Sequence, residues 1–176
     1  MERWPTVPER ALDDGGWERA DRSTETVFDL GVASVVGRTL LYEDPALRER
    51  LGTGETTRFF FATALDFRPT LPPGAEGVIE STVANEAADS FAADLRDRGF
   101  AGLRRRRQGT LRVDSGARAR LSNVRATCEV GGEQLDVTGW LAVWRDDGFL
   151  LAGGAYPEVG EEEYREELLS LIRAVE

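Results

Sequence analysis

The chain contains no lysine and no histidine, so all 22 of its basic residues are arginine. Without histidine, no side chain has an unperturbed pKa close to neutrality. Without lysine, there is no Schiff base, no amine nucleophile and no P-loop lysine. Arginine stays protonated at ordinary pH and cannot act as a general base. We therefore expect a non-enzymatic protein with no catalytic residues, no metal ligands and no cofactor.

The chain has one cysteine, Cys128, so an intrachain disulfide is excluded. Cys128 follows Ala126 and Thr127 in an apolar-alternating stretch, where a cysteine usually serves as a small buried side chain. The first residues lack the apolar region of a secretory signal, and no apolar run is long enough to span a membrane. These observations predict a cytoplasmic protein without a membrane partner.

Acidic residues outnumber basic ones by 32 to 22, which gives a net charge of −10. Such an excess discourages general adhesion to nucleic acid or to anionic membranes. An acid-rich, lysine-free composition indicates a cell interior of very high salt, where carboxylates hold water and cations. A GC-rich genome, which favours arginine codons, is the alternative explanation. Codon bias alone does not explain the acidic excess, so the halophilic interpretation is favoured.

The length of 176 residues predicts one domain, covering residues 1–176, that buries a core without metal or disulfide support. Helical spacing and capping residues predict helices over 8–12, 45–51, 82–98 and 161–175. Residues 24–42 are expected to form one strand or two, with Gly31 and Gly37 marking a bend, and residues 56–67 form another. An antiparallel meander is predicted over 103–156, broken by the turn sequences at 114–116, 131–132 and 146–148.

Several strands carry apolar residues on both faces. Trp140 and Trp144 alternate with Leu141 and Val143, so both sides of that strand are expected to be buried. We infer an α+β fold, a three-layer α/β/α sandwich around a mainly antiparallel sheet. Gly153 and Gly154 are expected to mark a bulge or close helix packing. Trp4 and Trp17, which lie among polar residues, are the better candidates for an exposed contact; the alternative is that they pack the first helix onto the sheet.

The order of elements resembles that of the Mog and PsbP-like superfamily. Within that likeness, the chain is similar to uncharacterised proteins of halophilic archaea, in segments that together span most of its length: Tyr42-Glu43-Asp44, Phe60-Phe61-Ala62-Thr63-Ala64-Leu65, Gly139-Trp140-Leu141 and Ala155-Tyr156-Pro157. The resemblance implies a PsbP-like α/β/α fold. It also implies an adaptor or accessory role through protein binding, and it assigns no functional residue.

Basic charge is concentrated in one segment. Residues 96–125 hold ten arginines against two aspartates, a local charge of +8, which leaves −18 on the rest of the chain. The candidate partner-binding or anion-binding residues are the arginines of this segment's predicted hairpin: Arg104, Arg105, Arg106, Arg107, Arg112, Arg118 and Arg120. Strand alternation would place Arg104 and Arg106 on one face and Arg105 and Arg107 on the other, so one pocket cannot hold all four.

Three interpretations of these arginines remain open. They pair with the protein's own acids or protect a sheet edge; they bind an acidic protein surface; or the domain binds a small molecule or anion in a pocket between sheet and helix. Nucleic acid is disfavoured because no aromatic residues are interleaved and high salt weakens phosphate contacts. The first function hypothesis is an adaptor that binds a protein partner. The sequence leaves the oligomeric state open.

Overall fold

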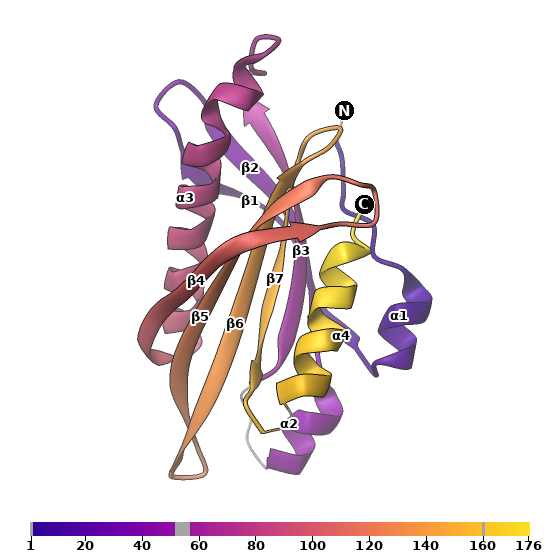
Figure 1. Cartoon of the computed structure of the whole chain (residues 1–176), viewed down its shortest axis with the longest axis vertical. Coiled ribbons are helices and arrows are strands. Elements are labelled where there is room, and N and C mark those ends of the chain that lie inside the picture. The colour runs from indigo at the N-terminus through magenta and orange to yellow at the C-terminus, as the bar shows by residue number, and fades with distance from the viewer. Residues whose placement is uncertain (1, 52–56, 160) are drawn as a thin grey trace.

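The computed structural model describes residues 2–51, 57–159 and 161–176. Its centre is a seven-stranded antiparallel sheet in the order β1-β2-β3-β7-β6-β5-β4 (Figure 1). The strands are β1 (Glu18–Asp29), β2 (Ser34–Glu43), β3 (Phe59–Arg68), β4 (Ala101–Arg112), β5 (Arg118–Val130), β6 (Glu133–Arg145) and β7 (Phe149–Pro157). β1 and β4 are therefore the two edges of the sheet, and β7, between β3 and β6, is central.

The described residues form four helices: α1 (Glu9–Asp14), α2 (Pro45–Leu51), α3 (Ala75–Asp97) and α4 (Glu161–Arg173). The long α3 lies on one face of the sheet, whereas α4 packs on the other face against β7 (Figure 1). Asp44 caps α2, as predicted, by accepting a hydrogen bond from the Leu47 N–H at 3.1 Å. No helix in the described residues is long and apolar enough to cross a membrane.

The predicted three-layer α/β/α sandwich, and with it the PsbP-like fold, is wrong. The antiparallel sheet makes up most of the molecule, and α1 and α2 have only six and seven residues. The error arose from the strands that are apolar on both faces, such as β6 and β7. These strands occupy the middle of the sheet, where one helix on each face suffices to bury them. Helical layers that span all seven strands are therefore not needed.

Two hydrophobic clusters lie on opposite faces of the sheet. On the α4 face, Trp144, Phe60 and Ile172 are fully buried. On the α3 face, Phe91, Leu95 and Leu141 are buried together. Cys128 belongs to the cluster on the α3 face and is buried, as the sequence predicted.

The N-terminal tryptophans were predicted to make an exposed contact. For Trp17 the alternative holds, because it is buried against Phe60 in the cluster on the α4 face. Trp4 is half-buried, with the Arg22 guanidinium 4.0 Å from its ring centroid.

The N-terminal strands differ from the prediction in their extent. Residues 24–42 belong to two strands joined at Gly31, whose φ of +83° suits a glycine turn. β1 begins at Glu18, well before the expected start, because an exposed edge strand of mostly polar residues has no apolar alternation to detect. The meander of β4 to β7 and its three turns is confirmed.

Helix α3 begins at Ala75, seven residues before the predicted start. Its first two turns contain Gly77 and the β-branched Val78 and Ile79, which are poor helix formers and hide the periodicity. The added turns extend α3 to the end of the sheet that lies beside the β1–β2 turn (Figure 1). The helix therefore forms a seam with the β4–β5 hairpin along one side and faces β1–β3 along the other.

Candidate binding surfaces

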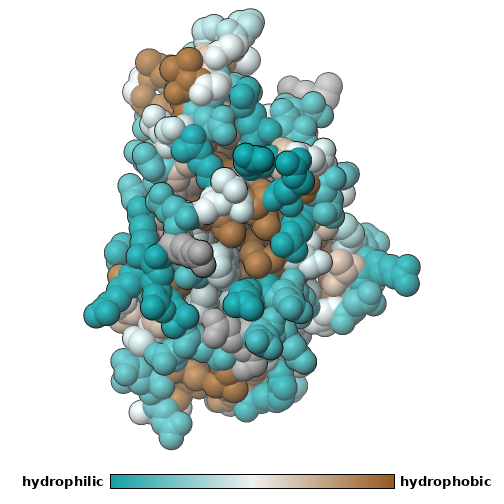
Figure 2. Space-filling view, in the orientation of Figure 1, coloured by the Kyte–Doolittle hydropathy of each residue, from teal (hydrophilic) through white to brown (hydrophobic). Residues whose placement is uncertain are grey.

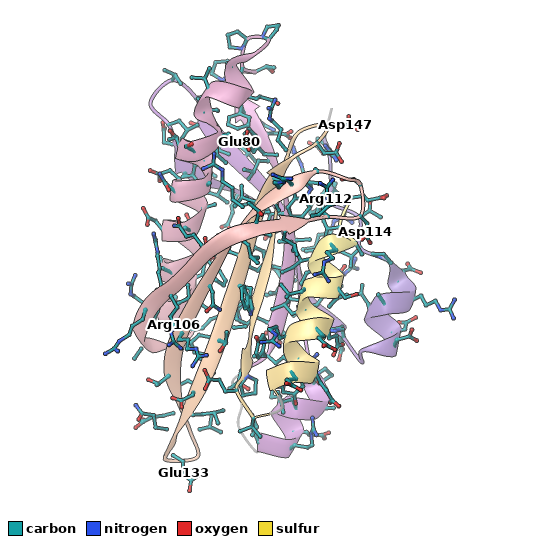
Figure 3. The ribbon with its side chains drawn as sticks, in the orientation of Figure 1. Glu80, Arg106, Arg112, Asp114, Glu133 and Asp147 are labelled. Carbon is teal, nitrogen blue, oxygen red and sulfur yellow. The ribbon has the colours of Figure 1, made fainter. Side chains whose placement is uncertain are left out.

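The predicted arginines lie on the outermost hairpin of the sheet. β4 is an edge strand, and the side chains of Arg104, Arg105, Arg106, Arg112, Arg118 and Arg120 are all exposed. Arg106 projects away from the sheet at this edge, and Figure 2 shows mostly hydrophilic side chains over the hairpin (Figures 2 and 3). The side chain of Arg107 lies outside the described part of the structure.

The hairpin brings arginines directly opposite one another. Arg104 pairs in register with Arg125, and Arg112 pairs with Arg118. Like charges opposite one another across a strand pair destabilise the sheet. Arg125 has a carboxylate nearby, that of Glu158 at 3.3 Å. Arg112 donates a hydrogen bond to the Gly116 carbonyl at 3.2 Å, within its own turn.

Few of these arginines pair with the protein's own acids. Arg105 is 2.5 Å from a carboxylate oxygen of Asp89 on α3, and both side chains are largely exposed. Among the side chains that the structure describes, no carboxylate lies within 4.0 Å of the other five exposed arginines, Arg104, Arg106, Arg112, Arg118 and Arg120. Ion pairs with the protein's own acids therefore neutralise only part of the positive charge of this segment.

Two hollows lie along the line where α3 meets the hairpin, and we call the two together the groove. One hollow of about 580 Å³ is lined on the hairpin by Arg118 and Arg120 and on α3 by Glu80 and Asn85. A second, of about 290 Å³, lies one to two turns further along α3. Its lining includes Arg96 and Arg105. We call the four arginines Arg96, Arg105, Arg118 and Arg120 the arginine seam.

The arginine seam contains only part of the predicted set. Arg105, Arg118 and Arg120 line the two hollows, whereas Arg104 stands in register with Arg125 outside them. Arg104 and Arg105 lie on opposite faces of the strand, as the sequence implied, but a register shift between Arg105 and Arg107 interrupts the predicted alternation after Arg105. Arg96 was not among the predicted residues, because it belongs to α3 and only the packing of α3 on the hairpin brings it close.

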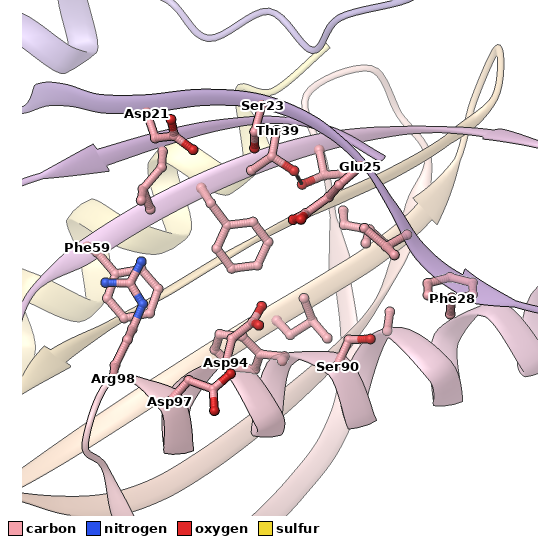
Figure 4. A pocket seen from close by; sticks show the side chains of 18 residues that line it. Asp21, Ser23, Glu25, Phe28, Thr39, Phe59, Ser90, Asp94, Asp97 and Arg98 are labelled. Atoms are coloured by element: carbon pink, nitrogen blue, oxygen red, sulfur yellow. Dashed lines mark hydrogen bonds between the residues drawn. The ribbon is translucent and has the colours of Figure 1, made fainter. Parts of the chain in front are cut away.

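A separate pocket of about 360 Å³ lies on the other side of α3, against β1, β2 and β3 (Figure 4). We call it the α3 pocket. Its interior is apolar and is lined by Leu41, Phe59, Phe61, Phe91, Leu141 and Leu151. Its charged residues and serines come from β1 (Asp21, Ser23 and Glu25), from α3 (Ser90, Asp94 and Asp97) and from Arg98, which caps α3. Thr39 of β2 and Thr63 of β3 add two hydroxyls.

The charges of the α3 pocket influence one another. Burial raises the pKa of the Asp94 carboxyl, and the nearby Glu25 and Asp97 raise it further, whereas Arg98 lowers it. Burial lowers the pKa of the Arg98 guanidinium, against the opposing effect of Glu43 and Asp94. The Arg98 guanidinium lies 3.9 Å from the centroid of the Phe59 ring.

No residue that lines the α3 pocket was predicted as a binding residue, although a pocket between sheet and helix was one of the predicted alternatives. A signal was present on α3, where Ser90, Asp94, Asp97 and Arg98 follow helical spacing beside the apolar Ala87 and Phe91. On β1, Asp21, Ser23 and Glu25 occupy alternate positions and so share one face, but the intervening Arg22 and Thr24 are also polar, so the sequence does not mark that face. What could not be predicted is that these two patterns face each other across one cavity.

A third charged group is buried and structural. The guanidinium of Arg58 lies between the rings of Trp17 and Tyr164, at 4.3 and 4.4 Å from their centroids. It donates hydrogen bonds to Asp44 and Glu167, and its side chain is 5% exposed. A side chain so fully engaged has little capacity to bind a ligand. Within the described residues, no group of three or more acids or cysteines is arranged to hold a metal ion.

A family model described as a domain of unknown function (DUF6517) matches residues 4–176. The match covers both candidate surfaces. No curated protein matches the chain.

Proposed function

We propose that this chain, which belongs to the DUF6517 family of domains of unknown function, is a non-enzymatic cytoplasmic binding domain that holds an acidic segment of a partner protein in its arginine seam. The observation that carries the proposal is a groove lined by exposed arginines whose charge the described side chains leave largely unbalanced.

The geometry of the seam favours an extended acidic segment over a single small anion. The two hollows follow successive turns of α3, so a ligand that reaches Arg118, Arg105 and Arg96 must be elongated. Carboxylates spaced along a peptide match arginines spaced along a strand and a helix. Arginine binds a carboxylate through two parallel hydrogen bonds, which adds specificity that charge alone does not give.

The salt concentration at which the protein works favours one of two possible partners, an acidic protein segment or a nucleic acid. We propose that the protein works in a high-salt interior, where screening acts over about 3 Å at about 1 M salt. Long-range attraction to a nucleic acid would be lost under those conditions. Close contacts between guanidinium and carboxylate groups, partly enclosed by the groove, are screened less. An acidic protein segment is therefore favoured over a nucleic acid.

The test uses a fluorescein-labelled decaglutamate peptide and fluorescence anisotropy in KCl. We expect the wild-type chain to bind it, and the triple variant R105Q/R118Q/R120Q to bind about tenfold more weakly. Each exposed ion pair contributes about 0.2–1 kcal/mol to binding. Loss of three such pairs therefore removes roughly 1.4 kcal/mol, which corresponds to a factor of ten in affinity.

The matched control removes the same charge from other exposed positions, R10Q/R19Q/R50Q, which lie on α1, β1 and α2. Its affinity for the peptide should stay within twofold of that of the wild type. Equal losses in the two triple variants would mean that net charge alone controls binding. Tighter binding of a single-stranded DNA oligonucleotide of equal charge would overturn the choice of an acidic protein partner.

A further inference from the structure

We infer that the α3 pocket is a second binding site, independent of the arginine seam, for a small organic cation with a ring-bearing apolar body. At about 360 Å³ the pocket lies within the range of about 300–1,000 Å³ typical of small-molecule sites. It combines an apolar interior with a few polar groups that converge on it, as such sites do.

The charge around the pocket selects the class of ligand. Four carboxylates line it, those of Asp21, Glu25, Asp94 and Asp97, against one cation, Arg98. Among the described side chains, no arginine lies within 4.0 Å of any of these four carboxylates. An anion would be repelled here, so the anion-binding alternative drawn from the sequence does not fit this pocket. A cation would offset the excess negative charge.

The lining of the pocket explains why the cation should carry a ring. Phe59, Phe61 and Phe91 are among the residues that line the cavity. Figure 4 shows the ring of Phe59 beside Arg98. Aromatic rings bind cations over their faces and pack against other rings in offset or edge-to-face arrangements. The protein already uses this interaction at one end of the pocket, where Arg98 lies over Phe59.

The lining places apolar and charged groups differently: Phe59 and Leu141 are buried, whereas Glu25 and Asp94 are exposed. The hydroxyls of Thr39 and Thr63 hydrogen-bond to each other at 2.8 Å, which engages one of their two protons. Leu141 and Leu151, from the central strands, complete the apolar lining. A ring placed against these residues leaves an attached ammonium group near Glu25 and Asp94, on opposite walls of the pocket.

Three compounds of matched shape test the inference: phenethylamine, which is cationic, phenethyl alcohol, which is neutral, and hydrocinnamate, which is anionic. Their binding to the full chain is measured by calorimetry, at the lowest KCl concentration that leaves the circular dichroism spectrum native. We expect phenethylamine to bind at least tenfold more tightly than the alcohol, and hydrocinnamate more weakly still. Equal affinity for the three compounds, or no binding of the amine, would overturn the inference.

Variants identify the site. E25Q/D94N should weaken amine binding at least tenfold and leave alcohol binding within twofold, whereas the control E49Q/D13N, at exposed positions on α2 and α1, should change neither. S90W, which fills the pocket from α3, should abolish binding of both compounds. Amine binding that survives both pocket variants would place the site elsewhere. R105Q/R118Q/R120Q should bind phenethylamine as the wild type does, because the two sites are separate.

Discussion

Arg58 shows how a single charged residue is accommodated inside this protein. Its guanidinium is buried between two aromatic rings and is hydrogen-bonded to Asp44 and Glu167. Trp17 donates a further hydrogen bond from Nε1 to Glu167 at 2.9 Å. The group thereby ties β3, α2, α4 and the residues that follow α1 together on one face of the sheet.

Replacing Arg58 by alanine should cost about 3–5 kcal/mol in the free energy of unfolding. Removal of one partner of a buried ion pair leaves the remaining charge, here that of Asp44, buried and uncompensated. Denaturant unfolding at fixed KCl measures the change. The matched control R50A removes an exposed arginine of α2 and should shift stability by no more than about 0.5 kcal/mol. A loss below about 1 kcal/mol for R58A would contradict the structural role.

The sequence predicted the strand or helix to which a residue belongs better than it predicted which distant residues surround its side chain. The sequence left open whether the hairpin arginines are exposed, and their exposure follows from the place of β4 at the edge of the sheet. The sequence left open whether Trp17 is buried, because its neighbours in the chain are polar and its burial depends on the distant Phe60 and Arg58. The α3 pocket was missed for the same reason, since its carboxylates come from β1 and α3.

The element that most depends on close packing is β7. A Cβ added at Gly154 would lie 2.2 Å from the Phe59 carbonyl oxygen, and one at Gly153 would lie 2.5 Å from that of Trp140. Both obstacles are backbone atoms of the neighbouring strands, which cannot move without disturbing the sheet. The predicted close helix packing applies in part at Gly154, where Leu168 of α4 would lie 3.0 Å from the added Cβ; the tighter contacts come from the neighbouring strands.

Substitution of Gly154 by alanine should therefore destabilise the protein by about 1–3 kcal/mol, the usual cost of overpacking, or by more. The control is G109A on the edge strand β4, where an added Cβ meets no atom within 4 Å. G109A should leave the unfolding free energy unchanged or raise it slightly, because alanine loses less backbone entropy than glycine on folding. Thermal unfolding of the two variants gives the comparison, and equal midpoints would refute the packing argument.

Helices and strands were predicted unequally well. The meander, its turns and the capped start of α2 have local signals in turn residues and capping groups. The start of α3 and the whole first half of β1 lack such signals. The prediction of the layers was wrong because apolar residues on both faces of a strand show that both faces are buried, but they do not show how many helices cover each face.

The whole molecule carries two opposed charge regions. Residues 96–125 hold +8, and the rest of the chain holds −18. The acidic surface repels itself unless salt screens it. We expect the chain to lose structure as KCl falls below roughly molar concentration, as an adaptation to a high-salt interior implies. Circular dichroism during dialysis measures this, and a spectrum that stays unchanged down to millimolar salt would contradict the halophilic interpretation.

The most direct test of the proposed function is chemical-shift mapping of the isotope-labelled chain with decaglutamate, at a KCl concentration where the fold is intact. The account predicts that amide signals change along the seam, in residues 80–96 of α3 and 105–122 of the hairpin, and that those of β1 and β2 do not. Changes centred on the α3 pocket, or none at all while the peptide is present in excess, would contradict the assignment of the arginine seam as the binding surface.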